Sequence, residues 1–308
     1  MSDLPRRRAL IRGTVLVMTA IAIAAGIEIG RRTKAEAHRL LTNPLETRRL
    51  PSLRPIDFGM VYDEVTAHTS DGLALAGWYV ASQNGMVIIA QHGYKADRAE
   101  MLEEAAMLHR HGYGVLISSI RAHDMSDGHL ITFGKNEMKD MAAWHALLRS
   151  RDDTKEATLG ILGNSMGGSL AIQYAADQRD IKAIATNSAF SSLADTIETS
   201  LRYFTKLPPF PFAPLIQFWA EREGGFRTDE IDAKAWIGRL SPRPVLLMQG
   251  GADIVISLSS GQRLYEAAGD PKELWVEPDV AHAKFDTAKP QEYERRVVGF
   301  FDKYLSGR

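Results

Sequence analysis

Residues Gly163-Asn164-Ser165-Met166-Gly167 carry the strongest structural signal in this sequence of 308 residues. They satisfy the pattern G-x-S-x-G and lie between an expected strand at 158–162 and an expected helix that begins at Met166. Glycine two residues to either side of a serine permits a tight strand-to-helix turn, which lifts the serine hydroxyl above a sheet. The first amides of the helix would then face a developing oxyanion. We therefore predict that Ser165 is a nucleophile.

Apolar runs and helical patterns alternate along the chain on both sides of this segment. Continuous apolar runs are typical of strands buried on both faces, as in a parallel sheet covered by helices. Strands that alternate with helices predict a mostly parallel, doubly wound α/β sheet, and Ser70-Asp71-Gly72 suits a hairpin turn between the first two strands. The expected strands are 61–68, 73–80, 86–90, 114–118, 158–162, 181–186, 245–248 and 273–276, and the expected helices are 98–110, 135–148, 166–176, 258–268 and 291–305.

Residues 190–240 interrupt the alternation. Prolines in this stretch exclude one continuous helix. Aromatic residues between two sheet strands indicate a lid over a pocket that accepts apolar groups, and we predict that Phe212 and Trp219 bind substrate there. A packing flap without a role in binding is the alternative. The prolines are Pro208, Pro209, Pro211 and Pro214, and the aromatic residues are Phe204, Phe210, Phe212, Phe218 and Trp219.

Composition limits the possible chemistry. The chain is 45% hydrophobic and 24% charged, which is an ordinary globular composition. The absence of cysteine excludes disulfides, thiolate metal sites and a cysteine nucleophile. Residues 1–54 hold eleven Lys/Arg and four Asp/Glu, a balance of +7, whereas the remainder holds 26 and 34, a balance of −8. A basic leader on an acidic body indicates a membrane for the leader and argues against nucleic acid as a partner of the body.

The leader has the shape of a membrane anchor. An uncharged run at 13–27 falls short of the roughly 20 residues of a full span, but snorkelling arginines or an extension to Ile29 would make it sufficient. A cleaved signal peptide, supported by a weak twin-arginine resemblance, and a buried soluble helix are the alternatives. We predict an anchor over 1–30, a proline-containing linker over 31–60 and a catalytic domain over 61–308. The flanking basic residues are Arg6, Arg7, Arg8, Arg12, Arg31 and Arg32.

With this serine turn and this alternation, the sequence resembles the α/β-hydrolase family over residues 60–305. In that family the order along the chain is serine, acid, histidine. Asp253 follows the expected strand at 245–248, and His282 follows the strand at 273–276. The resemblance implies that His282 is the base and that Asp253 orients it. Asp279 is the rival acid, because it lies three residues before His282.

The resemblance also implies an oxyanion hole and shows one departure. The donors would be the backbone amides of Met166 and Tyr94, the latter in Gln91-His92-Gly93-Tyr94, where His92 would brace the loop. Relatives carry Arg-Gly-His-Gly-x-Ser after the next strand, but here both glycines are replaced in Arg121-Ala122-His123-Asp124-Met125-Ser126. We expect the carboxylate of Asp124 to be solvated, or else to select against anionic substrates.

The similarity is to the serine-aminopeptidase-like and dienelactone-hydrolase-like bacterial branches, and it implies an anchored enzyme of the bacterial inner membrane. It implies a serine hydrolase that cleaves carboxylic ester, thioester or lipid acyl bonds. A peptidase on the same triad is the alternative, and a non-catalytic binding protein on this scaffold is the third. The expected partners are a small-molecule or lipid ester and the membrane. No metal-ligand cluster, P-loop or dinucleotide fingerprint occurs, so no metal or cofactor is expected.

Overall fold

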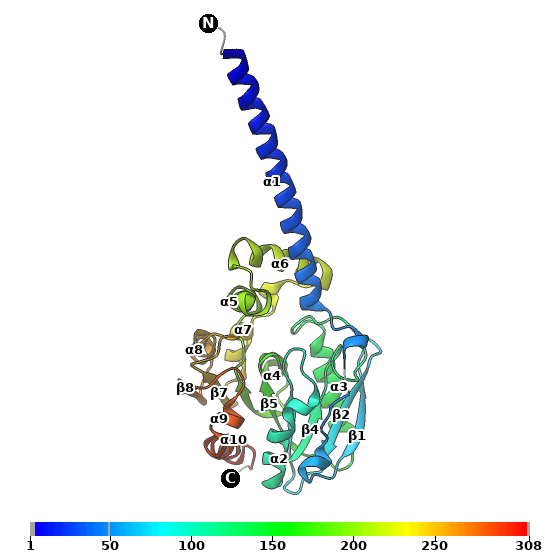
Figure 1. The fold of residues 1–308 in the computed structure, drawn as a ribbon. Coiled ribbons are helices and arrows are strands. Elements are labelled where there is room, and N and C mark those ends of the chain that lie inside the picture. Colours follow the sequence, from blue (N-terminus) through cyan, green and yellow to red (C-terminus); the bar gives the residue numbers. More distant parts are fainter. Residues whose placement is uncertain (1–3, 49, 307–308) are drawn as a thin grey trace.

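The computed structural model describes residues 4–48 and 50–306 and is built on one eight-stranded sheet (Figure 1). The strand order is β1-β2-β4-β3-β5-β6-β7-β8, and the sheet is parallel from β4 to β8. β1 and β2 form the expected hairpin, and β2 also pairs antiparallel with β4. The strands are β1 (Asp63–His68), β2 (Ala74–Val80), β3 (Met86–Gln91), β4 (Gly114–Ser118), β5 (Thr158–Asn164), β6 (Ile181–Asn187), β7 (Val245–Gly250) and β8 (Lys272–Glu277).

Helices cover both faces of the sheet, which confirms the predicted α/β-hydrolase architecture. α2 and α10 pack on one face, and α3, α4 and α8 pack on the other. The α-helices are α1 (Leu4–Leu41), α2 (Leu102–Arg110), α3 (Glu137–Ser150), α4 (Met166–Asp177), α5 (Leu193–Thr205), α6 (Pro209–Gly224), α7 (Ala233–Ile237), α8 (Leu258–Ala267), α9 (Phe285–Ala288) and α10 (Pro290–Leu305). Short 3-10 turns lie at Leu45–Thr47, Pro55–Phe58, Arg98–Met101, Thr228–Glu230 and Gly238–Leu240.

Strand β3 shows why these runs are apolar without alternation. Ile88 belongs to the hydrophobic core on one face of the sheet, and Ile89 belongs to the core on the other face. Both side chains are fully buried. Because successive side chains of a strand point to opposite faces, a strand covered on both sides must be apolar at every position.

The predicted lid insertion lies between β6 and β7 and contains α5, α6 and α7. α5 ends at Thr205, where Lys206 adopts a left-handed backbone with φ of 63°. α6 contains a kink at Phe210, in the proline-rich stretch that was expected to break a continuous helix. The lid therefore consists of separate helices, which pack over the sheet edge where the parallel strands end.

Helix α1 is longer than the predicted anchor and replaces the first part of the predicted linker. It runs to Leu41, and Thr33, Ala37 and Leu41, spaced four residues apart, are fully buried on one face of the helix. Charged neighbours at the intervening positions hide this spacing in the sequence. Residues 1–3, 49 and 307–308, which belong to the predicted anchor, linker and domain, lie outside the described residues.

The first part of α1 projects away from the rest of the molecule (Figure 1). Its large apolar side chains from Leu10 to Ile27 are each at least 56% exposed. The helix is long and apolar enough to cross a membrane, a property that an N-terminal signal sequence shares. The fold therefore has an apolar N-terminal helix whose C-terminal end joins the globular body.

Candidate active site

Ser165 occupies a strained turn between β5 and α4. Its backbone has φ of 53° and ψ of −118°, a conformation that residues other than glycine seldom adopt. A Cβ atom on Gly163 would lie 2.4 Å from the carbonyl carbon of Gly167, and one on Gly167 would lie 2.4 Å from the carbonyl oxygen of Gln91. Both glycines are therefore required by close backbone approach, and they allow the turn that presents the serine hydroxyl.

His282 lies between Ser165 and Asp253 and contacts both. Its Nε2 is 2.9 Å from the Ser165 Oγ, and its Nδ1 is 2.7 Å from Oδ2 of Asp253. A carboxylate accepts hydrogen bonds, so Nδ1 carries the proton and Nε2 is left to accept from the serine hydroxyl. This is the arrangement of a nucleophile beside an oriented general base.

Asp253 is held in place by the loop that follows β7. Its side chain is fully buried, and Oδ1 accepts hydrogen bonds of 2.8 Å from the amides of both Val255 and Ile256. The Gln249 side-chain amide donates to Oδ2 at 3.2 Å. These donors fix the direction in which the carboxylate faces the imidazole, as the role of an orienting acid requires.

The rival acid, Asp279, faces a different partner. Its side chain is 70% exposed and lies 3.2 Å from the Lys289 ammonium. The hydrogen bond from that ammonium lowers the pKa of the Asp279 carboxyl. The structure thus brings Asp253, and not Asp279, to the imidazole of His282.

The predicted oxyanion donors flank Ser165. Within residues 4–48 and 50–306, the backbone amides of Tyr94 and Met166 donate no hydrogen bond to another group of the protein. Met166 opens α4, whose first amides lack acceptors inside the helix. A Cβ on Gly93 would lie 3.2 Å from the Ser165 Cβ, so the loop of Tyr94 runs close beside the serine. Two unpaired amides next to a nucleophile suit an oxyanion hole.

Buried side chains hold this loop. Glu100 Oε2 accepts from the Gly93 amide at 2.6 Å. His92 donates from Nδ1 to the Gly93 carbonyl at 2.8 Å and accepts at Nε2 from the Ile120 amide at 3.4 Å. Burial lowers the pKa of His92 to about 4, so the ring stays neutral and can make both bonds. His92 therefore connects the loop to the chain after β4.

The segment with two missing glycines keeps the backbone that glycine would favour. Ala122 and Asp124 have φ of 59° and 48°, in the left-handed region. The Asp124 carboxylate is buried and lies 2.7 Å from Nε of Arg98. The expectation that Asp124 is solvated is therefore wrong, because its carboxylate is buried and paired with a buried arginine. Burial raises the pKa of Asp124, and Arg98 opposes this effect.

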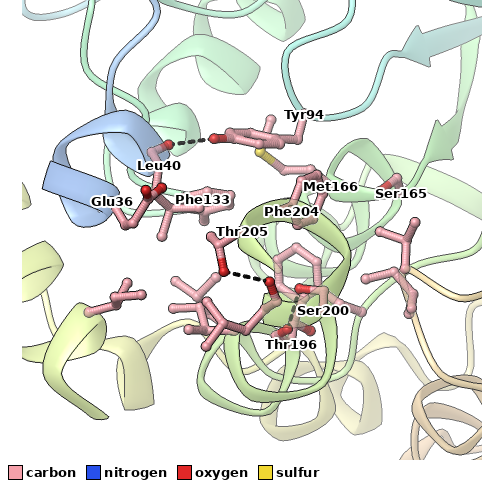
Figure 2. A pocket seen from close by; sticks show the side chains of 17 residues that line it. Glu36, Leu40, Tyr94, Phe133, Ser165, Met166, Thr196, Ser200, Phe204 and Thr205 are labelled. Atoms are coloured by element: carbon pink, nitrogen blue, oxygen red, sulfur yellow. Dashed lines mark hydrogen bonds between the residues drawn. The ribbon is translucent and has the colours of Figure 1, made fainter. Parts of the chain in front are cut away.

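An apolar pocket of about 670 Å³, including its mouth, opens at Ser165 (Figure 2). Among the described residues, no three His, Asp or Glu side chains are grouped so that they would hold a metal ion. The walls include Ile197, Leu201 and Phe204 of α5, Ile216 of α6, and Glu36 and Leu40 of α1.

The pocket residues differ from those predicted. Phe212 and Trp219 do not line the pocket and pack against the surrounding hydrophobic cluster. The Trp219 ring faces α1, where the Lys34 ammonium lies 5.5 Å from its centre, while Ile216 is the α6 residue that faces the pocket. Sequence reasoning missed the contribution of α1, because charged neighbours hide the four-residue spacing of Thr33, Ala37 and Leu41.

Comparison with known proteins places these residues in context. Residues 66–206 match the family described as X-Pro dipeptidyl-peptidase (S15 family), a range that includes Ser165 and ends before Asp253 and His282. YqkD of Bacillus subtilis is 29% identical over 236 residues, covering 75% of this chain and 76% of that protein. YfhR of Escherichia coli K12 is 26% identical over 248 residues, covering 77% and 80%. Both relatives are described as uncharacterised.

Solved structures share the architecture. The Pyrococcus furiosus esterase Pf2001 superposes with a TM-score of 0.73 at 26% identity, covering 86% of this chain and 98% of that chain. A dienelactone hydrolase from Anabaena variabilis superposes with a TM-score of 0.58 at 16% identity, covering 80% and 99%. The dienelactone hydrolase shares only the fold with this chain. The esterase Pf2001 is also as similar in sequence to this chain as the two relatives above.

Proposed function

Since the chain is a serine hydrolase of the α/β-hydrolase superfamily, we propose that it cleaves carboxylic esters whose acyl group occupies the apolar pocket beside Ser165. The observation that carries this proposal is the pocket wall. Glu36 is the one charged residue among those that line it, and the others are apolar or neutral. Such a wall stabilises a hydrocarbon chain by about 0.8 kcal/mol for each buried methylene group.

In the first step, the Ser165 Oγ attacks the ester carbonyl carbon while His282 Nε2 takes its proton. The resulting oxyanion accepts hydrogen bonds from the amides of Tyr94 and Met166, and Asp253 stabilises the imidazolium. The imidazolium then protonates the leaving alkoxide as the carbon–oxygen bond breaks. The alcohol departs, and the acyl group remains bound to the serine.

In the second step, water attacks the acyl carbon of the Ser165 ester. His282 takes a proton from that water and returns it to the Ser165 oxygen as the acyl–enzyme bond breaks. The carboxylic acid leaves and the free serine is restored. The 2.9 Å separation of Nε2 and Oγ is suited to proton transfer in both directions.

A peptidase reaction is the second candidate, because the matched family is described as a dipeptidyl-peptidase. The same nucleophile and base can attack an amide, and the Glu36 carboxylate in the pocket wall is a suitable partner for a peptide ammonium group. The other residues that line the pocket are apolar or neutral and offer few partners for a peptide backbone. We therefore place ester cleavage first.

We also propose that α1 anchors the enzyme in a membrane. Its exposed apolar side chains between Leu10 and Ile27 would otherwise face water, at a large cost in free energy. The packed residues Thr33, Ala37 and Leu41 would then hold the hydrolase body directly at the end of the span.

A substrate panel tests the function. The full chain is assayed with p-nitrophenyl esters of increasing acyl length and with an Ala-Pro p-nitroanilide, and it is treated with a fluorophosphonate probe. We expect ester hydrolysis that rises with acyl length, probe labelling, and loss of both in Ser165→Ala, since loss of a triad residue costs about 10⁴-fold or more in kcat. Faster cleavage of the anilide than of every ester would establish the peptidase reading. Labelling that persists in Ser165→Ala would exclude Ser165 as the nucleophile.

A further inference from the structure

The lid carries a concentration of exposed aromatic side chains. Tyr203, Phe204, Phe210 and Phe218, here called the aromatic surface, are 46%, 52%, 81% and 48% exposed. They are the four most exposed aromatic residues of the described chain, and all belong to α5 and α6 or the turn between them. Exposed apolar groups gathered on neighbouring helices mark a surface that contacts a membrane or another apolar partner.

This surface lies at the end of the body from which α1 projects. α5 and α6 cap that end, beside the lower part of α1 (Figure 1). α6 packs on α1, with Trp219 facing Lys34 and Glu223 lying 2.5 Å from His38. Lys34 is only seven residues beyond the apolar run that ends at Ile27, about 10 Å along a helix axis. If α1 spans a bilayer, α6 is at the depth of the lipid headgroups.

Charge on the lid also favours a membrane. Arg202, Lys206 and Arg222 form no ion pair within residues 4–48 and 50–306, and the latter two lie over the rings of Tyr203 and Phe218. Three of the four acids of α5 and α6 have partners: Asp195 pairs with Arg263, Glu221 accepts from Thr228, and Glu223 contacts His38. The remaining acid is Glu198. Aromatic rings flanked by free cations are typical of segments that lie in the headgroup region of a membrane.

The pocket and the aromatic surface share a residue. Phe204, a member of the aromatic surface, also lines the pocket, and its ring packs edge-on against Tyr94 (Figure 2). Glu36 and Leu40 form the neighbouring wall and belong to α1 itself. Residues of the proposed anchor and of the aromatic surface therefore line the same pocket.

From these contacts we infer that the aromatic surface lies in the lipid headgroup layer and that the pocket receives the acyl chain of a membrane lipid ester directly from the bilayer. This inference rests on the proposed ester hydrolysis and specifies its substrate class. An acyl chain that moves from the bilayer into an apolar pocket never crosses water, so its transfer avoids the cost of exposing methylene groups. A water-soluble ester would not require a pocket that lies beside the bilayer.

Site-directed labelling tests the surface without depending on activity. The chain contains no cysteine, so a single substitution places one nitroxide label on the full-length protein in vesicles of phosphatidylethanolamine and phosphatidylglycerol. Phe210→Cys and Phe218→Cys are compared with Val61→Cys, which is 83% exposed and lies at the start of the hydrolase body. We expect the two lid labels to be more accessible to oxygen, which concentrates in lipid, and the Val61→Cys label to be more accessible to a water-soluble nickel chelate.

Lid labels that are more accessible to the nickel chelate would overturn the inference. Labels shielded from both reagents would also overturn it, because another protein or a second copy of this chain would then cover the surface.

Activity tests the source of the substrate. The double variant Phe210→Ser/Phe218→Ser is compared with Ile56→Ser/Val61→Ser, which removes apolar groups of matched exposure, 52% and 83%, away from the lid. Neither lid residue lines the pocket of Ser165. We expect the lid variant to hydrolyse a vesicle-embedded lipid ester about tenfold more slowly, and a soluble short-chain ester at the wild-type rate. The control variant should match the wild type on both.

Each other result has a distinct meaning. Equal loss on both esters, or no loss on the embedded ester, would overturn delivery from the bilayer. A wild-type protein that cleaves neither ester would overturn the proposed function and the lipid substrate with it, and the labels would still decide where the aromatic surface lies.

Discussion

The hydroxyl of Tyr94 donates a 2.7 Å hydrogen bond to the backbone carbonyl of Leu40. Leu40 lies in the last turn of α1, where the backbone carbonyls receive no hydrogen bond from within the helix. The backbone amide of Tyr94 is one of the two proposed oxyanion donors. The neighbouring Lys95 ammonium donates to the Arg39 carbonyl at 2.5 Å. Burial raises the pKa of Tyr94, so the hydroxyl keeps its proton. The loop beside the nucleophile thus caps the C-terminal end of α1.

We expect Tyr94→Phe to weaken this link without removing the amide. Loss of one hydrogen bond should lower the free energy of unfolding by about 1 kcal/mol, and looser positioning of the amide should lower kcat by roughly fivefold. The control is Tyr113→Phe, which loses a partly buried hydrogen bond to Asp302 far from the site. Thermal melts and ester kinetics check both variants. Equal kcat in the two would show that the link to α1 has no role in catalysis.

Asp253→Asn should lower kcat by roughly 10⁴-fold, because an amide favours the wrong tautomer of His282. The matched change Asp279→Asn should leave kcat close to the wild-type value, since Asp279 faces Lys289 at the surface. Ester hydrolysis by the two purified variants decides the assignment. A larger loss in Asp279→Asn than in Asp253→Asn would transfer the role of the acid.

Two truncations should behave differently. Deletion of residues 1–30 removes the exposed apolar run and leaves the packed residues Thr33, Ala37 and Leu41. We expect that carbonate extracts this truncated protein from membranes and that it hydrolyses a soluble ester at the rate of the full-length protein. Deletion of residues 1–42 also removes Glu36 and Leu40 from the pocket wall, so stability and activity should both fall. If the protein without residues 1–30 still required detergent for release from membranes, a single-helix anchor would be contradicted.

Ile197→Phe should shorten the preferred acyl chain, because Ile197 is a buried residue of the pocket wall. Each methylene group excluded from the pocket should raise the activation free energy that corresponds to kcat/KM by about 0.8 kcal/mol. Ile197→Val is the control and should leave the profile unchanged or extend it. Phe212→Ala/Trp219→Ala should lower thermal stability without moving the profile, since neither side chain lines the pocket. A profile flattened by that double variant would restore them to substrate binding.

Glu104 should make stability depend on pH. It is fully buried behind the serine turn, where Asn164 donates to its Oε1 at 3.0 Å. Burial raises its pKa to about 8, and Asp286 and Glu100 contribute in the same direction. Because the folded state holds this proton more tightly than the unfolded state, its contribution to stability is complete below about pH 4.5 and is lost as pH rises to about 8.

Glu104→Gln removes this titration and keeps a group that can accept from Asn164. We therefore expect its melting temperature to fall less than that of the wild type between pH 5 and pH 8. Thermal melts across that interval measure the difference. Parallel curves for the two proteins would show that Glu104 does not titrate in the folded state.

Sequence reasoning was sufficient for the features that depend on local spacing. The two glycines around Ser165 specify a tight turn because only a residue without a side chain fits there, whatever the rest of the fold does. Apolar runs identified the central strands, because a strand covered on both faces must be apolar throughout. The resemblance to the α/β-hydrolase family implied the roles of Asp253 and His282, and their positions after β7 and β8 agree with it, because parallel strands bring their ends to one edge of the sheet.

Tertiary structure decided everything that depends on which surfaces meet. Asp253 and Asp279 both precede His282 in the chain, and only the path of the loops after β7 and β8 directs one of them to the imidazole. Glu36 and Leu40 lie in a stretch expected to be a linker, yet packing of α1 on α6 makes them walls of the pocket. Trp219 turns away from that pocket for the same reason. Helix-to-helix contacts join residues almost two hundred positions apart, and no local pattern records which face of one helix will bury which face of another.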